Sequence, residues 1–238
     1  MRNAIVLCSG GIDSITTAYY VKKKLKYKDI IILFFDYTQR TLNQEKTKSK
    51  KCAKNLNAKF IEIGLKELGK ISTSLINTDK KAKKVYRKEL KNTKKESEKF
   101  YVPCRNIIFL TYALSLAESL YKKTKKVYDI FVGFKQEGRE SYPDTTKKFV
   151  NSINNLSKVS CMGKFKIIAP LIEKDKEDII LLGRKLGLNF KDTFSCYICN
   201  KKHCGICLAC RLRQEGFYWA NIKDLTDYKI KMKDFRSA

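Results

Sequence analysis

Apolar and polar residues alternate along most of the chain in a pattern that predicts strands and helices in regular succession. Apolar runs of about four to eight residues, bounded by turn residues, are typical of buried strands. Longer segments with apolar residues three or four positions apart are typical of helices that pack on a sheet. The predicted strands are 4–8, 29–37, 58–65, 127–134 and 164–171, and the predicted helices are 13–25, 42–56, 103–121, 146–156 and 176–188.

This alternation predicts parallel strands joined by right-handed helical crossovers. The expected fold class is therefore α/β, an open, doubly wound, Rossmann-like parallel sheet of five strands with a small C-terminal module. We expect the main domain to span residues 1–190 and the C-terminal module residues 191–238. Residues 66–100 are rich in Lys, Glu, Ser, Thr and Asn, and we expect a mobile insertion or lid there. Ligands of such sheets bind at the carboxyl ends of the strands.

Composition narrows the class of protein. The chain has 238 residues, of which 43% are hydrophobic, which is enough for one sizeable core. It contains no apolar run of about 18 residues, so we expect no membrane-spanning helix. The N-terminus turns polar too early for a signal peptide. Nine cysteines without such a signal indicate a reducing compartment, and we expect a cytoplasmic protein whose cysteines bind metal or catalyse.

The formal net charge of +27 comes almost entirely from lysines spread over the whole chain. Nucleic-acid surfaces more often favour arginine with interleaved aromatic residues. We interpret the lysines mainly as a solvated surface and expect no specific nucleic-acid partner, although a true polyanion-binding surface is the alternative. Either interpretation predicts salt-dependent, non-specific binding to polyanions.

The motif CSGGIDS, from Cys8 to Ser14, lies between the first predicted strand and the first predicted helix. Its two glycines permit a tight turn, and the N–H groups that follow can bind an anion at the helix N-terminus. The hydroxyls of Ser9 and Ser14 can donate to phosphate oxygens, and Asp13 can cap the helix or hold Mg²⁺. The motif lacks the lysine of GxxxxGK[ST] and differs from GxGxxG. It therefore predicts a nucleotide-phosphate loop of another kind, with a simple Gly-Gly turn as the alternative.

Polar residues follow the second strand and open the helix that begins near residue 103. Asp36, Gln39 and Arg40 are placed to contact adenosine or to order the loop, although Arg40 could equally form a surface ion pair. Arg105 and Asn106 fall in the first turn of the helix. A guanidinium there can hold a carboxylate or phosphate at two points. The sequence thus places groups suited to adenosine and to a carboxylate or phosphate at one sheet edge, with a solvent-exposed arginine at the helix start as the alternative for Arg105.

A loop with the segment Tyr-Pro-Asp follows the fourth strand. Glu137, Tyr142 and Asp144 are the candidates there, because a carboxylate can accept from the ring N–H and exocyclic amine of an amino-pyrimidine edge. A simple turn is the alternative. Lys176, after the fifth strand, is placed to reach the phosphates, or else lies on the surface.

The segment 195–213, SCYICNKKHCGICLACRLR, holds five cysteines and the only histidine of the chain. Cys-x-x-Cys steps let two thiolates bind one zinc ion, and sites of this kind are usually closed and structural. Spacing alone does not decide which four groups bind, because Cys199 and His203 compete with the other cysteines. We expect a structural zinc that pins the C-terminal module beside the active edge. Redox use of the thiols is the alternative.

Taken in order, SGGIDS, FDYTQR, VPCRN, YPD and the cysteine segment cover nearly the whole chain. This order resembles the 7-cyano-7-deazaguanine synthase family, QueC, of the N-type ATP-pyrophosphatases. The resemblance implies an adenine nucleotide alpha hydrolase-like fold. Its zinc ligands carry over to Cys196, Cys204, Cys207 and Cys210. Its phosphate loop carries over to Cys8, Ser9, Gly10, Gly11, Ile12, Asp13, Ser14, Ile15, Thr16, Thr17 and Ala18.

The resemblance also implies a reaction, that of a ligase forming C–N bonds in queuosine and archaeosine biosynthesis. A 7-carboxy-7-deazaguanine carboxylate attacks the α-phosphate of ATP, and ammonia then displaces AMP to give an amide. A second ATP activates the amide oxygen, and elimination gives the nitrile, 7-cyano-7-deazaguanine (preQ0). Mg²⁺ shields the phosphates, and we assign catalytic roles to Arg105 and Lys176. The family implies a homodimer, and free ammonia is the simplest nitrogen source.

Some residues depart from the pattern of many members of the family. The chain has GRESYPDTT where they have Asp-Tyr-Ser-Gly-Tyr-Pro-Asp-Cys-Arg, so Gly138, Arg139 and Thr145 differ. This leaves open a paralogue that stops at the amide or modifies another carboxyl. A second alternative is a tRNA-modifying ATP-pyrophosphatase that uses Cys104 and Cys161 as reactive thiols. A third is a zinc-module nucleic-acid binder without enzymatic activity.

Overall fold

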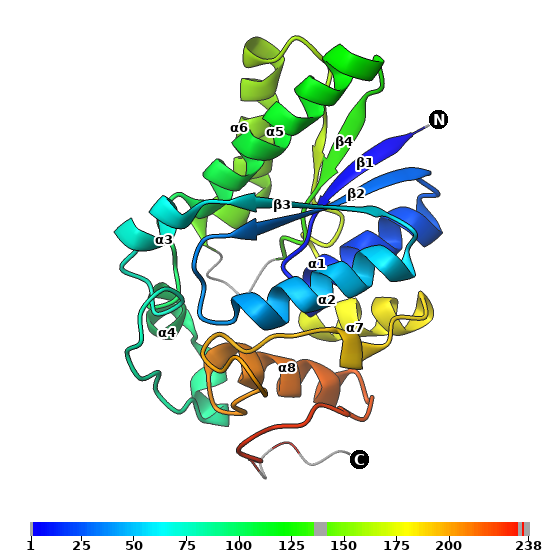
Figure 1. Cartoon of the computed structure of the whole chain (residues 1–238). Coiled ribbons are helices and arrows are strands. Elements are labelled where there is room, and N and C mark those ends of the chain that lie inside the picture. The colour runs from blue at the N-terminus through cyan, green and yellow to red at the C-terminus, as the bar shows by residue number, and fades with distance from the viewer. Residues whose placement is uncertain (1, 136–141, 233–234, 236–238) are drawn as a thin grey trace.

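The computed structural model describes residues 2–135, 142–232 and 235. Its centre is a sheet of five parallel strands in the order β3-β2-β1-β4-β5 (Figure 1). The predicted fold class is therefore confirmed. The strands are β1 Asn3–Leu7, β2 Asp29–Asp36, β3 Lys59–Gly64, β4 Tyr128–Phe131 and β5 Ile167–Ile168.

The five predicted helices are present in the predicted order, and the structure adds three more, two within residues 66–100 and one near the C-terminus. The helix expected over 13–25 is an α-helix only to Tyr19 and continues as a π-helical turn, Tyr20–Lys24. A helix that was not predicted, α8, follows the cysteines. The helices are α1 Ile12–Tyr19, α2 Leu42–Asn55, α3 Lys66–Ile71, α4 Lys94–Glu98, α5 Arg105–Thr124, α6 Lys147–Ser160, α7 Lys176–Lys185 and α8 Leu208–Trp219.

Helices cover both faces of the sheet, as the doubly wound pattern requires. Figure 1 shows α5 and α6 on one face, with α1 and α2 on the other. Alternate strand residues supply the two cores, because successive side chains of a strand point to opposite faces. Ile5 and Leu33 pack with the residues of α5, whereas Val6 and Ile32 pack with those of α1 and α2.

The strand order places the crossover switch between β1 and β4. From β1 the chain adds β2 and β3 on one side and later β4 and β5 on the other. The loops after β1 and β4 therefore diverge, and such a switch point is where open α/β sheets bind ligands. Gly133, just after β4, approaches the start of α1 so closely that an added Cβ would lie 2.9 Å from the amide nitrogen of Ser14. Only glycine fits that contact.

The strands β4 and β5 are shorter than predicted, and β5 forms only two residue pairs with β4. At the free edge of β5, the Asn154 side chain takes the place of a neighbouring strand. Its Nδ2 donates to the Ile167 carbonyl oxygen at 2.9 Å, and its Oδ1 accepts from the Ile167 N–H at 2.8 Å. A side-chain amide thus satisfies the backbone groups that an edge strand leaves open.

Residues 66–100 contain α3, α4 and a 3-10 turn at Arg87–Lys91. Several apolar side chains of this segment, among them Leu68, Ile76 and Val85, are buried in the core that α5 also forms, whereas Ile71 is exposed. The Val85 N–H also donates to the Ile206 carbonyl oxygen at 2.9 Å. The segment therefore has defined contacts with the core and the cysteine region, and its use as a lid stays a prediction.

The C-terminal residues pack against the main sheet through α8, which lies beside α7 (Figure 1). The Phe194 N–H donates to the Gly10 carbonyl oxygen at 2.8 Å, so the segment before the cysteines contacts the loop after β1. The domain boundary at residue 190 remains a prediction. Within the described residues, none of the helices has both the length and the apolar character needed to cross a membrane.

Candidate active site

The loop after β1 turns sharply at Gly10 and ends at Gly11, the N-cap residue of α1. Gly10 has φ +77°, and an added Cβ would lie 2.7 Å from the carbonyl oxygen of Glu45. Both the left-handed backbone and the close approach of α2 require glycine. The turn leaves the first N–H groups of α1 at a helix N-terminus, which attracts anions.

Hydrogen bonds hold this loop in shape. The Ser9 N–H donates to Ser14 Oγ at 3.2 Å, and Ser14 Oγ lies 3.2 Å from the Gly11 carbonyl oxygen. The remaining predicted loop residues lie inside the first turns of α1 and are buried, so they fix the helix on the sheet. These are Ile12, Ile15, Thr16, Thr17 and Ala18.

A cavity of about 240 Å³ opens beside the loop at the carboxyl ends of β1, β2 and β4. Its wall combines polar groups of the loop and of α5 with aromatic rings from three segments. The rings of Tyr37, Phe109 and Tyr197 give it faces on which a planar heterocycle can stack. The lining includes Cys8, Ser9, Gly11, Asp13, Ser14, Gln39, Glu45, Arg105, Asn106 and Gly133.

A second, smaller cavity of about 130 Å³ shares the wall formed by Ser9, Asp13 and Glu45. Lys176, at the start of α7, enters its lining. The Lys176 Nζ lies 2.7 Å from each carboxylate oxygen of Asp13. The fold thus brings Asp13 and Lys176 together, and the ammonium of Lys176 lies beside the loop after β1.

The side chain of Lys176 packs against α8 at Gly216. An added Cβ at Gly216 would lie 2.3 Å from Lys176 Cγ, so the glycine makes room for the lysine stem. Ser195 and Arg213 also line the smaller cavity. Arg213 is 1% exposed, and its guanidinium donates to Thr193 Oγ1 at 2.8 Å and Ser195 Oγ at 3.1 Å. Residues beyond the sheet therefore complete the wall of the smaller cavity.

The three residues predicted after β2 mainly shape their own turn. The Asp36 carboxylate accepts from the Thr38 N–H at 3.0 Å. Gln39 is buried, accepts from the Tyr37 N–H at 3.0 Å, and lines the larger cavity. Arg40 donates to the Lys80 carbonyl oxygen at 2.8 Å, which connects it to the 66–100 segment. Of the three, Gln39 alone appears in the cavity wall described above.

Arg105, Asn106 and Asp144, three residues predicted to contact the substrate, lie close together, and the first two line the larger cavity whereas Asp144 is not part of its described wall. The Asn106 Nδ2 donates to the backbone carbonyl oxygen of Asp144 at 3.2 Å, and Arg105 Nε donates to Asn106 Oδ1 at 3.2 Å. Burial raises the pKa of Asp144, which the charge of Arg105 opposes. Burial also raises the pKa of Tyr37 to about 12, so this phenol stays neutral beside the guanidinium.

The Tyr-Pro-Asp segment contacts the 66–100 segment. Tyr142 donates through its hydroxyl to the Ser97 carbonyl oxygen at 2.7 Å and stacks on Tyr101 with ring centres 5.6 Å apart. Tyr142 thus contacts the candidate lid and is not among the residues that line either cavity described above. Glu137, the other candidate in this loop, lies outside the described residues.

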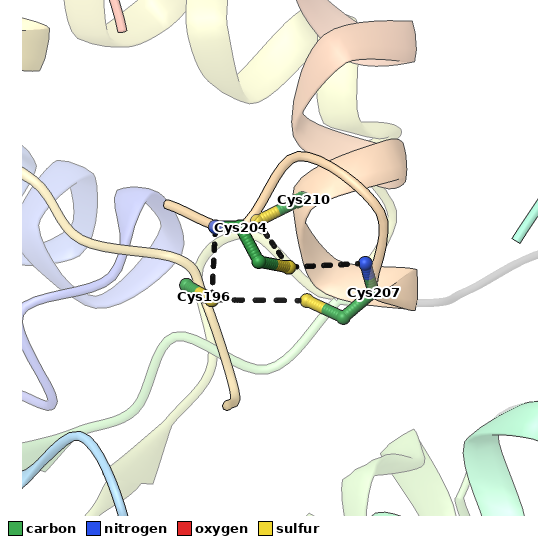
Figure 2. Close-up of side chains that lie close together, drawn as sticks. All are labelled: Cys196, Cys204, Cys207 and Cys210. Atoms are coloured by element: carbon green, nitrogen blue, oxygen red, sulfur yellow. Dashed lines mark hydrogen bonds between the residues drawn. The ribbon is translucent and has the colours of Figure 1, made fainter. Parts of the chain in front are cut away.

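Figure 2 shows four cysteine side chains that point toward one another: Cys196, Cys204, Cys207 and Cys210. All four are buried, and their Sγ atoms lie within 4.8 Å of one another. Cys207 is the N-cap of α8 and Cys210 lies in its first turn. Gly205, with φ +83°, makes the turn between Cys204 and the helix. An added Cβ there would lie 2.0 Å from the Ile230 carbonyl oxygen.

The spacing of these thiols fits a tetrahedral metal ion. Zn–S bonds of about 2.3 Å in a tetrahedron put sulfur atoms about 3.8 Å apart. The Sγ atoms of Cys204 and Cys210 are 3.8 Å apart, and those of Cys196 and Cys207 are 4.0 Å apart. Backbone N–H groups donate to the sulfur atoms, from Cys204 to Cys196 Sγ at 3.4 Å and from Cys207 to Cys204 Sγ at 3.2 Å. Such donors favour the thiolate form that binds metal.

Cys199 and His203, the two other candidates for metal ligands in this segment, lie outside the four-sulfur group. Cys199 contributes its backbone N–H, which donates to Cys196 Sγ at 3.3 Å, and its thiol is not part of the four-sulfur group. His203 Nε2 accepts from the Ser195 N–H at 3.0 Å. Burial lowers the pKa of His203 to about 4, which keeps the ring neutral for that hydrogen bond. The structure thus groups the four cysteines that the family resemblance implied.

Sequence reasoning did not single out several lining residues. Glu45 stands in the first turn of α2, and a carboxylate one helical turn beyond the FDYTQR motif was a detectable signal. Tyr197 comes from the cysteine segment, and Arg213 from α8, and no local pattern indicates that they reach the cavities. Their positions depend on how the C-terminal module packs.

Comparison with known proteins gives consistent matches. The family model for the queuosine biosynthesis protein QueC matches residues 3–221. A 7-cyano-7-deazaguanine synthase from Methanosphaera stadtmanae is 34% identical over 95% of this chain and 98% of its own length. A synthase of the same name from Nitratiruptor sp. is 36% identical over 95% of this chain and 98% of its own.

Among solved structures, a 4-thiouridine synthetase–RNA complex with bound ATP is 18% identical, with a TM-score of 0.45, over 80% of this chain and 42% of that chain. NMN synthetase from Francisella tularensis is 12% identical, with a TM-score of 0.41, over 92% of this chain and 84% of that chain. The family model and the curated relatives extend over nearly all of the sequence, including the cysteine segment. The chain therefore belongs to the QueC family of queuosine biosynthesis proteins.

Proposed function

We propose that this chain converts 7-carboxy-7-deazaguanine and ammonia to 7-cyano-7-deazaguanine at the expense of ATP. Family membership gives the reaction class. The observation that carries the proposal is the joined pair of cavities: the phosphate loop opens at one end toward Lys176 and at the other toward Arg105 and the aromatic rings. A nucleotide triphosphate and a planar anionic heterocycle have complementary places there.

The triphosphate of ATP would lie across the N-terminus of α1, where backbone N–H groups and the helix dipole favour negative charge. The hydroxyls of Ser9 and Ser14 stand beside it. Lys176 would stabilise the departing pyrophosphate, since a cation aimed at a leaving group lowers the barrier. The carboxylate of Asp13 is the group that would hold Mg²⁺, and the ion would shield the phosphate charge.

The carboxylate of the second substrate would bind to Arg105, because a guanidinium can hold it at two points and orient one oxygen toward the α-phosphate. The heterocycle would stack on the rings of Tyr37 and Phe109. Asn106 lines this cavity and would bind the polar edge of the heterocycle. Asp144, whose backbone carbonyl oxygen accepts from Asn106 Nδ2, would be the carboxylate that accepts there. The same arrangement would hold the amide for its activation by a second ATP.

We further propose that the four cysteines hold a structural zinc ion. Four protein ligands leave no open position, so the ion would stabilise the fold and take no part in the reaction. Its role would be to keep Tyr197 and Ser195 in the cavity walls. A homodimer in the cytoplasm, free ammonia as nitrogen source, and no specific nucleic-acid partner complete the proposal.

The test is an assay with purified protein, 7-carboxy-7-deazaguanine, ammonium and Mg²⁺-ATP, with products identified by mass spectrometry. We expect AMP and pyrophosphate, with two of each formed for every nitrile. Accumulation of the amide alone would identify a paralogue that stops at that step. An absence of substrate-dependent AMP formation would overturn the proposal.

The tRNA-modifying alternative is less well supported by the positions of its two thiols. Cys104 lies at the start of α5, whereas Cys161 caps the end of α6. Beside Cys161, the Met162 N–H donates to Glu118 of α5. Glu118 and Cys104 are separated by about 20 Å at the rise of an α-helix. These two cysteines therefore do not form a pair.

A further inference from the structure

Glu45 lies where the two cavities of the site meet. It lines both the cavity of the aromatic rings and the cavity of Lys176. Two neutral groups fix its carboxylate: Thr41 Oγ1 donates at 2.6 Å and Gln39 Nε2 donates at 3.1 Å. A carboxylate has about four acceptor positions, so two hydrogen bonds leave capacity for a further donor from the cavity.

The other acid at this junction is differently placed. Asp13 also lines both cavities, but the Lys176 ammonium lies 2.7 Å from both of its oxygens. The hydrogen-bond donors of Glu45 carry no charge. Burial raises the pKa of Glu45, so its carboxylate has a greater affinity for a proton than an exposed glutamate.

Other common proton acceptors are less suitable. The only histidine, His203, is buried beside the cysteines, and its Nε2 already accepts from Ser195. Tyr37 stays protonated, with its pKa raised to about 12 by burial. Cys8 has a pKa lowered to about 7, chiefly by a hydrogen bond from Cys52, and it remains as a competitor in the larger cavity.

We propose that Glu45 forms the ammonium site of this enzyme and accepts a proton from the bound ammonium ion. This inference rests on the proposed function. One N–H proton of ammonium moves to the carboxylate and leaves ammonia. The nitrogen lone pair forms the C–N bond to the acyl adenylate, the C–O bond to AMP breaks, and AMP leaves with that electron pair. The second proton passes from the nitrogen to solvent water.

The charged surroundings agree with this role. Arg105 faces Glu45 across the larger cavity and favours its ionised form, while Tyr37 is neutral there. On the side of the smaller cavity stand the ion pair of Lys176 with Asp13 and the guanidinium of Arg213. These cations would bind anionic substrates, and among the described residues that line the two cavities Glu45 is the carboxylate left to attract a cationic one.

The test is the variant Glu45→Gln, in which the amide can replace both hydrogen bonds of the carboxylate. Two half-reactions are measured. Substrate-dependent exchange of labelled pyrophosphate into ATP without ammonium reports adenylation, and we expect it to stay within about threefold of wild type. Amide formation with ammonium near pH 7 is expected to fall about 100-fold, the scale of a lost general base. The deficit should narrow as rising pH supplies free ammonia.

Glu62→Gln is the matched control, because Glu62 is exposed on β3 and pairs with Lys46 of α2 outside the cavities. It should change neither half-reaction. Equal loss of exchange and amide formation in Glu45→Gln, or a deficit that does not narrow with pH, would overturn the proposal. So would a selective loss of the ammonia step in Cys8→Ser with Glu45→Gln unaffected. Absence of exchange in the wild-type protein would instead refute the proposed function.

Discussion

The N-terminal ends of α1 and α8 are preceded by similar backbone turns, but the two turns present different chemical groups. α1 follows Gly10, with φ +77°, and α8 follows Gly205, with φ +83°. Both glycines permit a tight turn just before the helix and a close contact with a neighbouring carbonyl group. One turn presents N–H and hydroxyl donors, and the other presents thiols.

The two turns differ in their exposure: the turn before α1 opens to cavities, whereas the turn before α8 lies among buried thiols. The loop before α1 is held by its own hydrogen bonds, such as Ser9 to Ser14, and opens to two cavities. The four cysteines are buried, with 3.8 Å between the sulfur atoms of Cys204 and Cys210. The open turn before α1 suits the exchangeable anion of the proposed function, whereas the buried turn before α8 suits a metal ion that is retained.

The largest effect is expected at the second turn. Cys204→Ser should abolish metal binding and lower the Tm by about 10 °C or more, because each lost kcal/mol lowers it by about 2–4 °C. Cys199→Ser should keep both the metal and the Tm, since its thiol lies outside the four-sulfur group. Metal content by mass spectrometry and thermal unfolding by circular dichroism measure these outcomes. Equal losses in the two variants would make Cys199 a ligand.

At the first turn, Gly10→Ala should reduce ATP–pyrophosphate exchange about 100-fold, since small displacements of a binding loop have effects of that size. Its left-handed φ and its 2.7 Å approach to the Glu45 carbonyl oxygen both exclude a Cβ. Gly64→Ala is the control, because an added Cβ at Gly64 meets no atom within 4 Å. Equal activity of both variants would show that the turn tolerates displacement.

The next prediction concerns Lys176, the cation beside the loop after β1. Lys176→Met should lower kcat/KM for ATP about 100-fold, because it removes charge stabilisation of the leaving pyrophosphate while keeping the packing of the stem. Lys185→Met, on the exposed face of the same helix, should be close to wild type. Steady-state kinetics at fixed substrate concentration compares them. A loss confined to thermal stability would leave Lys176 a purely structural role.

The smallest effect on activity is expected where Gly216 of α8 contacts the side chain of Lys176. Gly216→Ala adds a Cβ 2.3 Å from Lys176 Cγ, so the lysine must shift away from α8. We expect a fall in kcat/KM of about tenfold, equivalent to about 1.4 kcal/mol, with full metal content. Kinetics and metal analysis on one preparation decide this. Loss of metal in this variant would show that α8 cannot adjust without opening the cysteine cluster.

The sequence alone predicted the parallel α/β sheet, because buried strands and amphipathic helices have periodicities that are local in the chain. It also predicted the phosphate loop and a cysteine site, since both depend on a few residues close in sequence. Tertiary structure decided the rest. It separated the four grouped cysteines from Cys199, paired the free edge of β5 with the side chain of Asn154, and placed Glu45 between two cavities.

The physical reason is the range of the contacts involved. Asn154 of α6 meets Ile167 of β5 across 13 positions of the chain, and Lys176 meets Asp13 across 163 positions. Such contacts depend on the helix packing and the strand order, which no short window of sequence contains. Local pattern determined which chemical groups the protein has, and long-range packing decided which of them share a site.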